Sequence, residues 1–86
     1  MRVDYHRNFI KNLVKLPLNI RQTFHRKLKV FIENKFNQIL DNHQLHGEFL
    51  GCRSINITGD YRAIFVEDND VATFLRIGTH HQLFGR

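Results

Sequence analysis

Seven side chains that can exchange protons or bind phosphate are spread over the second half of the chain. They are His43, His46, Arg53, Asp60, Arg62, His80 and His81. Histidine gives or takes a proton near neutral pH, whereas arginine stays charged and holds a phosphate through two parallel hydrogen bonds. Together these residue types suit phosphoryl chemistry, provided that the fold brings distant residues into one place.

Each of these residues also has a structural interpretation. Asp60 follows a glycine, which is ordinary turn chemistry. The adjacent His80 and His81 can cap a terminal turn, and the head of Arg62 can pair with Asp60 or Glu48. Only their placement in the fold separates a catalytic role from a structural one.

Other kinds of reactive site find less support. The six histidines come without paired cysteines or helical His spacing backed by a carboxylate, so we expect no metal. Cys52 is the single cysteine and most resembles a small hydrophobic strand residue. The sequence has no glycine-rich phosphate cradle, and we expect no cofactor.

The first half of the chain predicts one strand and two helices. Residues 1–5 alternate apolar and polar side chains, as in a half-buried strand. Apolar residues then recur at helical spacing over about residues 7–16 and 18–35. Pro17 lies between the two patterns and predicts the break, because it lacks an amide hydrogen and disfavours helix before it. The result is a tight helical hairpin.

The second half predicts a short helical turn and a surface loop over residues 36–50, followed by strands. A period-two pattern runs from residue 51 to 57. The strands predicted over 61–66 and over 71–77, the latter rich in β-branched and large apolar residues, follow after polar turns. We expect an antiparallel meander. The fold class is therefore α+β, with an N-terminal strand and a helical hairpin packed on one face of a small antiparallel sheet, whose other face is partly open.

Size and composition predict a single domain covering residues 1–86. The chain is 42% hydrophobic and contains eight Phe, enough for a core. One cysteine, no signal peptide and no long apolar run predict a cytoplasmic protein with no membrane contact. Charge is uneven: residues 1–35 carry nine Lys and Arg against two acids, whereas residues 36–86 carry four Arg against six acids. A basic first half favours an anionic partner, or is a solvated helix face.

Four segments of the second half resemble the RelE/ParE superfamily of bacterial toxins, and most of all its YafQ-like branch of mRNA interferases. The segments are His43-Gln44-Leu45-His46-Gly47, Gly51-Cys52-Arg53-Ser54, Gly59-Asp60-Tyr61-Arg62-Ala63-Ile64-Phe65 and Ile77-Gly78-Thr79-His80-His81-Gln82-Leu83-Phe84-Gly85. The resemblance implies a RelE-like fold and a toxin of a type II toxin–antitoxin system. It further implies a ribosome-dependent, metal-independent endoribonuclease that cleaves mRNA.

The same resemblance implies partners. These are a cognate antitoxin protein, the ribosome and mRNA, and operator DNA bound by the toxin–antitoxin complex through the antitoxin. Within the YafQ pattern, His43, Asp60, His80 and Phe84 match positions that the family uses, and Tyr61 stands where the family usually has Trp. Asn56 replaces a family histidine and cannot exchange a proton. Arg62 resembles an arginine of RelE-type toxins.

These residues make a consistent mechanism for RNA, which supplies its own nucleophile in the 2′-hydroxyl. We expect His80 to be the general acid and Asp60 or His43 to be the base. Arg62 and Arg53 would hold the phosphate. Further RNA contacts are expected from Asn56, His46 and His81, and base stacking from Tyr61 or Phe84.

Two alternatives from other classes stay open at this point. A ParE-like toxin would have the same fold and inhibit a DNA topoisomerase by binding, without ribonuclease activity. An inactive module would use the strands only as a groove for the antitoxin. His43, Asp60 and His80 favour the nuclease over the ParE-like toxin, and loss of toxicity on His80→Ala would exclude the inactive module.

Overall fold

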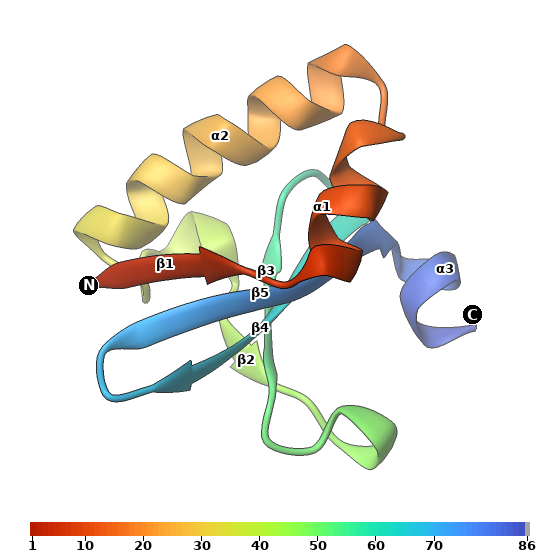
Figure 1. The fold of residues 1–86 in the computed structure, drawn as a ribbon. Coiled ribbons are helices and arrows are strands. Elements are labelled where there is room, and N and C mark those ends of the chain that lie inside the picture. The colour runs from red at the N-terminus through yellow and green to blue at the C-terminus, as the bar shows by residue number, and fades with distance from the viewer. Residues whose placement is uncertain (86) are drawn as a thin grey trace.

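In the computed structural model, which describes residues 1–85, two helices pack on one face of a five-stranded sheet (Figure 1). The elements in chain order are β1 (Arg2–Tyr5), α1 (Arg7–Val14), α2 (Leu18–Glu33), the 3₁₀ turn η1 (Gln38–Leu40), β2 (His43–Gln44), the 3₁₀ turn η2 (Gly47–Phe49), β3 (Arg53–Asn56), β4 (Tyr61–Asp68), β5 (Val71–Thr79) and α3 (His80–Phe84). The predicted α+β class is confirmed.

The helical hairpin forms where the apolar spacing predicted it. His6 caps α1, because its ring Nδ1 accepts a hydrogen bond from the Asn8 amide at 3.0 Å. Pro17 separates the helices, and its carbonyl accepts from the Arg21 amide at 3.1 Å in the first turn of α2. Each helix ends two residues before the predicted end. Within residues 1–85, no helix has the length and apolar character that crossing a bilayer requires.

The predicted meander is confirmed in β3, β4 and β5, which pair antiparallel in that order. At the end of the sheet nearest α3, Asn56 lies opposite Arg62, and Arg62 lies opposite Gly78. Because side chains alternate along a strand, the neighbours Tyr61 and Ala63 point to the other face. This register decides which residues can meet on the face without the hairpin.

The sheet as a whole is mixed rather than antiparallel, because β1 pairs with β5 in parallel and the order is β1-β5-β4-β3-β2. Arg2 lies opposite Val71 and Tyr5 opposite Phe74. A parallel pair needs a long crossover connection, which here includes both helices of the hairpin. The strand predicted at the N-terminus is therefore part of the sheet and forms one of its edges.

The segment predicted as a helical turn and a surface loop is more ordered than expected. Its helical turn is η1, but His43 and Gln44 pair with Ser54 and Arg53 and form the opposite edge strand, β2. A two-residue strand has no period of its own, so the pattern could not predict it. As a result, His43 is fixed to the sheet.

The described residues end with the short helix α3, where the sequence predicts only a terminal turn. The Thr79 side chain accepts from the Gln82 amide at 3.1 Å, and the Gln82 side chain accepts from the Thr79 amide at 2.8 Å. This reciprocal capping box satisfies amides at the start of α3. Gly78 makes room for it, because a Cβ at residue 78 would lie 2.8 Å from the Gln82 Oε1.

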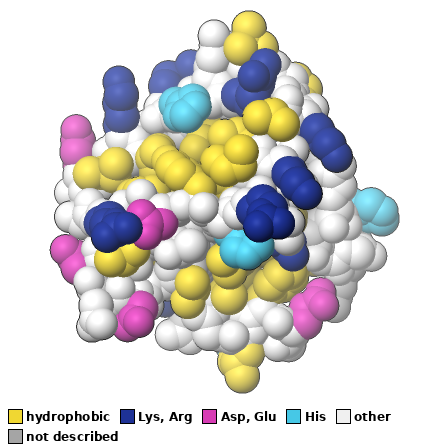
Figure 2. Space-filling view, viewed as in Figure 1, with side chains coloured by type: hydrophobic (Ala, Val, Ile, Leu, Met, Phe, Trp, Pro, Cys, Tyr) yellow, Lys and Arg dark blue, Asp and Glu magenta, His cyan; other side chains and the backbone are white. Residues whose placement is uncertain are grey.

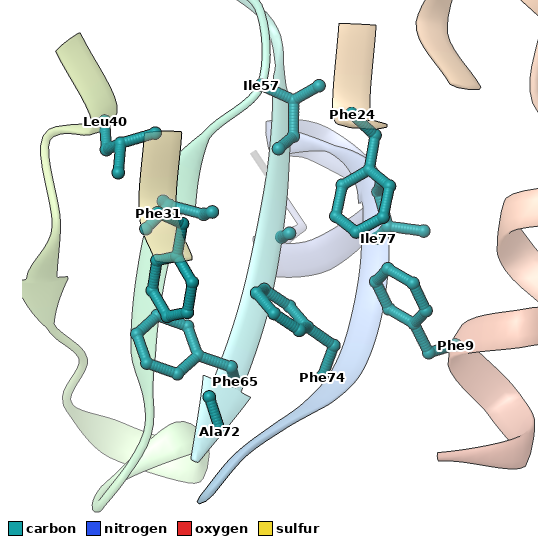
Figure 3. Packing of buried hydrophobic residues seen from close by; sticks show 11 residues of the cluster. Phe9, Phe24, Phe31, Leu40, Ile57, Phe65, Ala72, Phe74 and Ile77 are labelled. Atoms are coloured by element: carbon teal, nitrogen blue, oxygen red, sulfur yellow. The ribbon is translucent and has the colours of Figure 1, made fainter. Parts of the chain in front are cut away.

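Aromatic rings from both layers fill the core between the hairpin and the sheet (Figure 3). Phe9, Phe24 and Phe31 come from the helices, and Phe65 and Phe74 come from the sheet; all five are fully buried. Phe74 lies at the centre, with ring centroids 5.6 Å from Phe9, 5.8 Å from Phe24 and 5.5 Å from Phe31. The predicted role of Phe in the core is confirmed.

The sheet face opposite to the hairpin is partly covered. Ile64 and Ser54 both lie on this face and are fully buried. Two segments outside the meander contact each other, since the rings of Phe49 in η2 and Phe84 in α3 meet edge to face at 5.8 Å. The opposite face therefore carries a hollow bounded by turns and a short helix.

Candidate active site

A cavity of about 570 Å³ lies between the β2–η2 segment, β4 and α3. Its lining residues are Asp41, His43, Leu45, His46, Gly47, Glu48, Phe49, Arg62, His80 and Phe84. Of the residues predicted for the site, five line this cavity: His43, His46, Arg62, His80 and Phe84. Residues that lie up to 41 positions apart in the sequence thus share one hollow.

Arg62 reaches the cavity because it occupies the outward face of β4. Its neighbour Ala63 is fully buried in the core, so alternation directs Arg62 to the opposite side. The guanidinium Nη1 lies 3.5 Å from the carbonyl oxygens of Thr58 and Gly59, the limit for a hydrogen bond. No carboxylate among residues 1–85 forms an ion pair with Arg62, so its charge is available to an anion.

His80 reaches the cavity as the first residue of α3. Its amide donates to the Asp60 carbonyl at 3.0 Å, which ties the start of α3 to the β3–β4 turn. The imidazole packs against the ring of Phe84 one turn later, with centroids 4.9 Å apart. Backbone and ring contacts therefore both restrict where this imidazole lies.

His43 lies on the opposite wall, on the edge strand β2. Its ring Nδ1 is 2.7 Å from the carbonyl oxygen of Asp41 and 3.8 Å from the Asp41 Oδ2. The side chain of His43 is 45% exposed, so solvent and a ligand can reach it. The cavity thus has one imidazole on each of two separate segments.

Asp60 is close to the site without lining it. It lies exposed in the β3–β4 turn, and its backbone carbonyl, rather than its carboxylate, makes the contact to His80. Its own amide lies 3.3 Å from the Thr58 hydroxyl. These backbone contacts are the ones expected of Asp60 as a turn-forming residue.

Arg53 and Asn56 are separated by strand alternation. Arg53 points to the hairpin side, where its Nε donates to the Asn42 Oδ1 at 2.7 Å and its guanidinium lies 5.5 Å from the Phe36 ring centroid. It does not line the cavity. Asn56 lies opposite Arg62 on the cavity side of the sheet, and its Oδ1 is buried with no hydrogen-bond partner among residues 1–85.

The remaining two predicted RNA contacts also lie outside this cavity. Tyr61 packs against the core and lines a second hollow of about 500 Å³, next to Lys15 and Leu83. His81 is exposed on α3. The short helix α3 therefore separates two hollows, with His80 and Phe84 on one side.

Sequence reasoning missed the cavity's two carboxylates. Asp41 and Glu48 line the wall, whereas the carboxylate predicted from the resemblance was Asp60. From the sequence, Glu48 is expected only as an ion-pair partner for Arg62. The one sequence signal for Asp41 is its position two residues before His43, which permits a local contact within a turn.

The hairpin adds a basic surface to the molecule. No Asp or Glu occurs from residue 5 to residue 32, a stretch that includes α1 and most of α2. Figure 2 shows Lys and Arg side chains around an apolar area on the face viewed in Figure 1. Positive charge therefore surrounds an apolar part of this face.

The cavity brings together residue types that suit phosphate binding and proton transfer. Arg62 can neutralise a phosphate, and His43 and His80 can take a proton at one position and supply one at another. Phe84 offers a ring for stacking. Among residues 1–85, no group of three or more His, Cys, Asp or Glu side chains is arranged to hold a metal ion.

The fold is similar to solved toxin structures. The crystal structure of YafQ from E. coli strain BL21(DE3) aligns with a TM-score of 0.81 at 24% identity, over 99% of this chain and 100% of that chain. The E. coli DinJ–YafQ complex aligns with a TM-score of 0.72 at 22% identity, over 99% and 100%. The archaeal RelE–RelB complex from Pyrococcus horikoshii OT3 gives 0.72 at 23% identity, over 91% and 92%. The predicted RelE-like fold is confirmed.

The sequence itself identifies the family. No curated protein sequence matches the chain. The family model described as "Bacterial toxin of type II toxin-antitoxin system, YafQ" matches residues 1–85. Because this match extends over all the elements described above, the chain belongs to the YafQ family of toxins from bacterial type II toxin–antitoxin systems.

Proposed function

We propose that this toxin is an endoribonuclease that cleaves mRNA on the ribosome, without a metal ion, at the cavity lined by His43, Arg62 and His80. The observation that supports it most is their convergence from β2, β4 and α3 around one hollow. Two proton-exchanging groups and one permanent cation are the minimum for moving a phosphate diester with a side-chain acid and base. The family match adds to this, since it favours a YafQ-type toxin over the ParE-like alternative.

The proposed reaction uses the 2′-hydroxyl of the RNA as nucleophile. A base removes the proton from this hydroxyl, and its oxygen attacks the adjacent phosphorus. The bond from phosphorus to the 5′-oxygen of the next nucleotide breaks, and the general acid gives that oxygen a proton. The products are a 2′,3′-cyclic phosphate and a free 5′-hydroxyl. Atoms and charges balance without any further reactant.

The catalytic role proposed for each residue is based on where it lies in the cavity. His80 acts as general acid, and Arg62 holds the non-bridging phosphate oxygens, where negative charge grows in the transition state. Of the two candidates for the base, His43 is favoured because it lines the cavity, whereas Asp60 contributes a backbone carbonyl to the start of α3. Phe84 is the stacking residue favoured by the cavity, and His46 is a further RNA contact in the same wall.

The basic surface of the helical hairpin supports a proposal for the partners of this toxin. Ile10 and Val14 lie one turn apart on α1 and are exposed, as are the neighbouring Lys11 and Lys15. We propose that an acidic, amphipathic segment of a cognate antitoxin covers this surface, and that the antitoxin carries the complex to operator DNA. The cations of α2 are proposed to rest on ribosomal RNA phosphates. Two of the similar structures are toxin–antitoxin complexes, which supports the antitoxin part.

The experiment is cleavage of a defined mRNA on translating ribosomes, with the new ends mapped. The wild-type toxin is expected to give cuts ending in a 2′,3′-cyclic phosphate. His80→Gln should lower the cleavage rate about 10²- to 10⁴-fold, since it removes the general acid. His25→Gln is the matched control, because it removes an exposed imidazole of α2 that does not line the cavity.

The outcomes separate the alternatives. An unchanged rate in folded His80→Gln would reject His80 as the acid. No RNA cleavage by a wild-type toxin that still arrests growth would favour topoisomerase inhibition or another binding mode. If neither the wild-type protein nor His80→Gln arrests growth, the chain is better explained as an inactive antitoxin-binding module.

A further inference from the structure

The contact between Asp41 and His43 has a defined direction. The Asp41 oxygen that lies 2.7 Å from the His43 Nδ1 is a backbone carbonyl, which can only accept a hydrogen bond. At this distance the ring nitrogen must therefore carry the proton and donate it. In a neutral imidazole, a proton on Nδ1 leaves the lone pair on Nε2. The backbone thus selects one tautomer of His43.

The carbonyl is held in position by an uncommon backbone conformation. Asp41 has φ of 46°, in the left-handed region, which Asp adopts more readily than most residues. It ends η1, and its amide donates to the Gln38 carbonyl at 3.3 Å. This turn brings the Asp41 carbonyl back onto a ring only two residues further along the chain.

The carboxylate of the same residue adds a second, electrostatic contact. The Asp41 Oδ2 lies 3.8 Å from the His43 Nδ1, and Asp41 itself lines the cavity. The Asp41 side chain is 67% exposed, so water screens its carboxylate, and the backbone carbonyl is the contact that fixes the ring.

We propose that Asp41 is a positioning residue that holds His43 in the Nδ1–H tautomer, so that Nε2 is the proton acceptor of the site. This inference rests on the proposed function for its consequence, because the acceptor removes the proton of the RNA 2′-hydroxyl. It assigns the base to His43 and gives Asp41 a role that acts through the backbone. A ring in the other tautomer would present an N–H where an acceptor is needed.

The chain offers a set of variants that separate backbone from carboxylate. Asp41→Val disfavours positive φ and moves the carbonyl, because a branched Cβ is strained there. Asp41→Gly keeps the backbone conformation and removes only the carboxylate. Asn69→Val is the matched control, since Asn69 has φ of 48° in the β4–β5 turn and does not line the cavity.

The test measures the tautomer directly, by ¹³C and ¹⁵N NMR of labelled histidine rings at a pH where they are neutral. The His43 signals are assigned by their loss in His43→Gln. Wild type, Asp41→Gly and Asn69→Val should show His43 with its proton on Nδ1. Asp41→Val should show the Nε2–H form, and its cleavage rate should fall at least about tenfold, up to the 10²- to 10⁴-fold expected for losing the base.

The NMR measurement tests the role of Asp41, and the cleavage measurement tests the proposed function, so the two can fail separately. An Nε2–H ring in wild type, or a tautomer that Asp41→Val leaves unchanged, would overturn the role of Asp41 even in an active nuclease. Conversely, an Nδ1–H ring in a wild-type protein that cleaves no RNA would support the positioning contact and reject the proposed function. Unfolding of Asp41→Val is detected by circular dichroism, and Asp41→Ala, with a smaller side chain at the same positive φ, then replaces it.

Discussion

Arg62 brings a positive charge to the cavity wall without a carboxylate partner among residues 1–85. Its two contacts to carbonyl oxygens are both 3.5 Å long. An arginine that stabilised the fold would be expected in closer contacts than these. On the facing strand, the Asn56 Oδ1 is buried without a hydrogen-bond partner among residues 1–85, although Asn56 does not line the cavity.

This arrangement gives a prediction for Arg62. Arg62→Gln should lower RNA cleavage by roughly 10- to 100-fold, because a hydrogen bond to a charged group contributes about 1.5–3 kcal/mol. Arg62→Lys should recover part of the rate, since it restores the charge but not the two parallel donors. Single-turnover cleavage rates measure both. A stability loss without a rate loss would show instead that Arg62 serves the fold.

Alternation along a strand predicts part of the site, and it also explains why Arg53 lies outside the site. The period that puts Ile55 and Ile57 in the core includes Arg53, so the sequence already contained the reason why Arg53 faces the hairpin rather than the cavity. Asp60 and Asp41 are different. Both lie in turns, where no period exists, and only the folded structure shows which of the two residues lines the cavity.

The short helix α3 positions His80 through its capping box. Five residues are too few for a helix to be stable alone, so α3 depends on the Thr79–Gln82 contacts, on Gly78 and on packing against β5. Periodicity predicts the long helices and strands, whereas α3, η2 and β2 are too short to show it. Elements of two to five residues show too little periodicity and form because of contacts with distant parts of the chain.

A second prediction concerns this capping box. Thr79→Ala should destabilise the protein by about 1 kcal/mol, within the 0.5–2 kcal/mol typical of lost caps, whereas Thr79→Ser should keep the hydroxyl and most of the stability. Urea unfolding measures the loss, and hydrogen exchange of the α3 amides shows whether it is local. Equal stability of the Ala and Ser variants would mean that packing alone fixes α3.

Charge is divided unevenly over the whole molecule. The acid-free stretch from residue 5 to residue 32 includes the hairpin, whereas six of the eight acids lie in the second half. The net charge of +5 understates how basic the hairpin surface is. Because phosphate contacts release counterions, binding through this surface should weaken steeply as salt rises.

A third prediction follows for ribosome binding. Arg26→Gln and Lys29→Gln remove exposed cations of α2, and each should lower the slope of log affinity against log salt by roughly one. Arg2→Gln is the control, since Arg2 already pairs with Asp4 at 3.0 Å. Affinity for purified ribosomes is measured over a salt series. Slopes identical to wild type would place the docking surface elsewhere.

The parallel pairing of β1 with β5 joins the first strand of the chain to the last. During synthesis, residues 2–5 emerge long before residues 71–74, and the strand cannot find its neighbour until both are outside the exit tunnel. Such distant pairing slows folding, because the chain loses the entropy of loop closure before the contacts between the two strands stabilise the fold. The wall that contains His80 follows β5 directly, so the cavity is complete only once residues 71–84 have joined the fold.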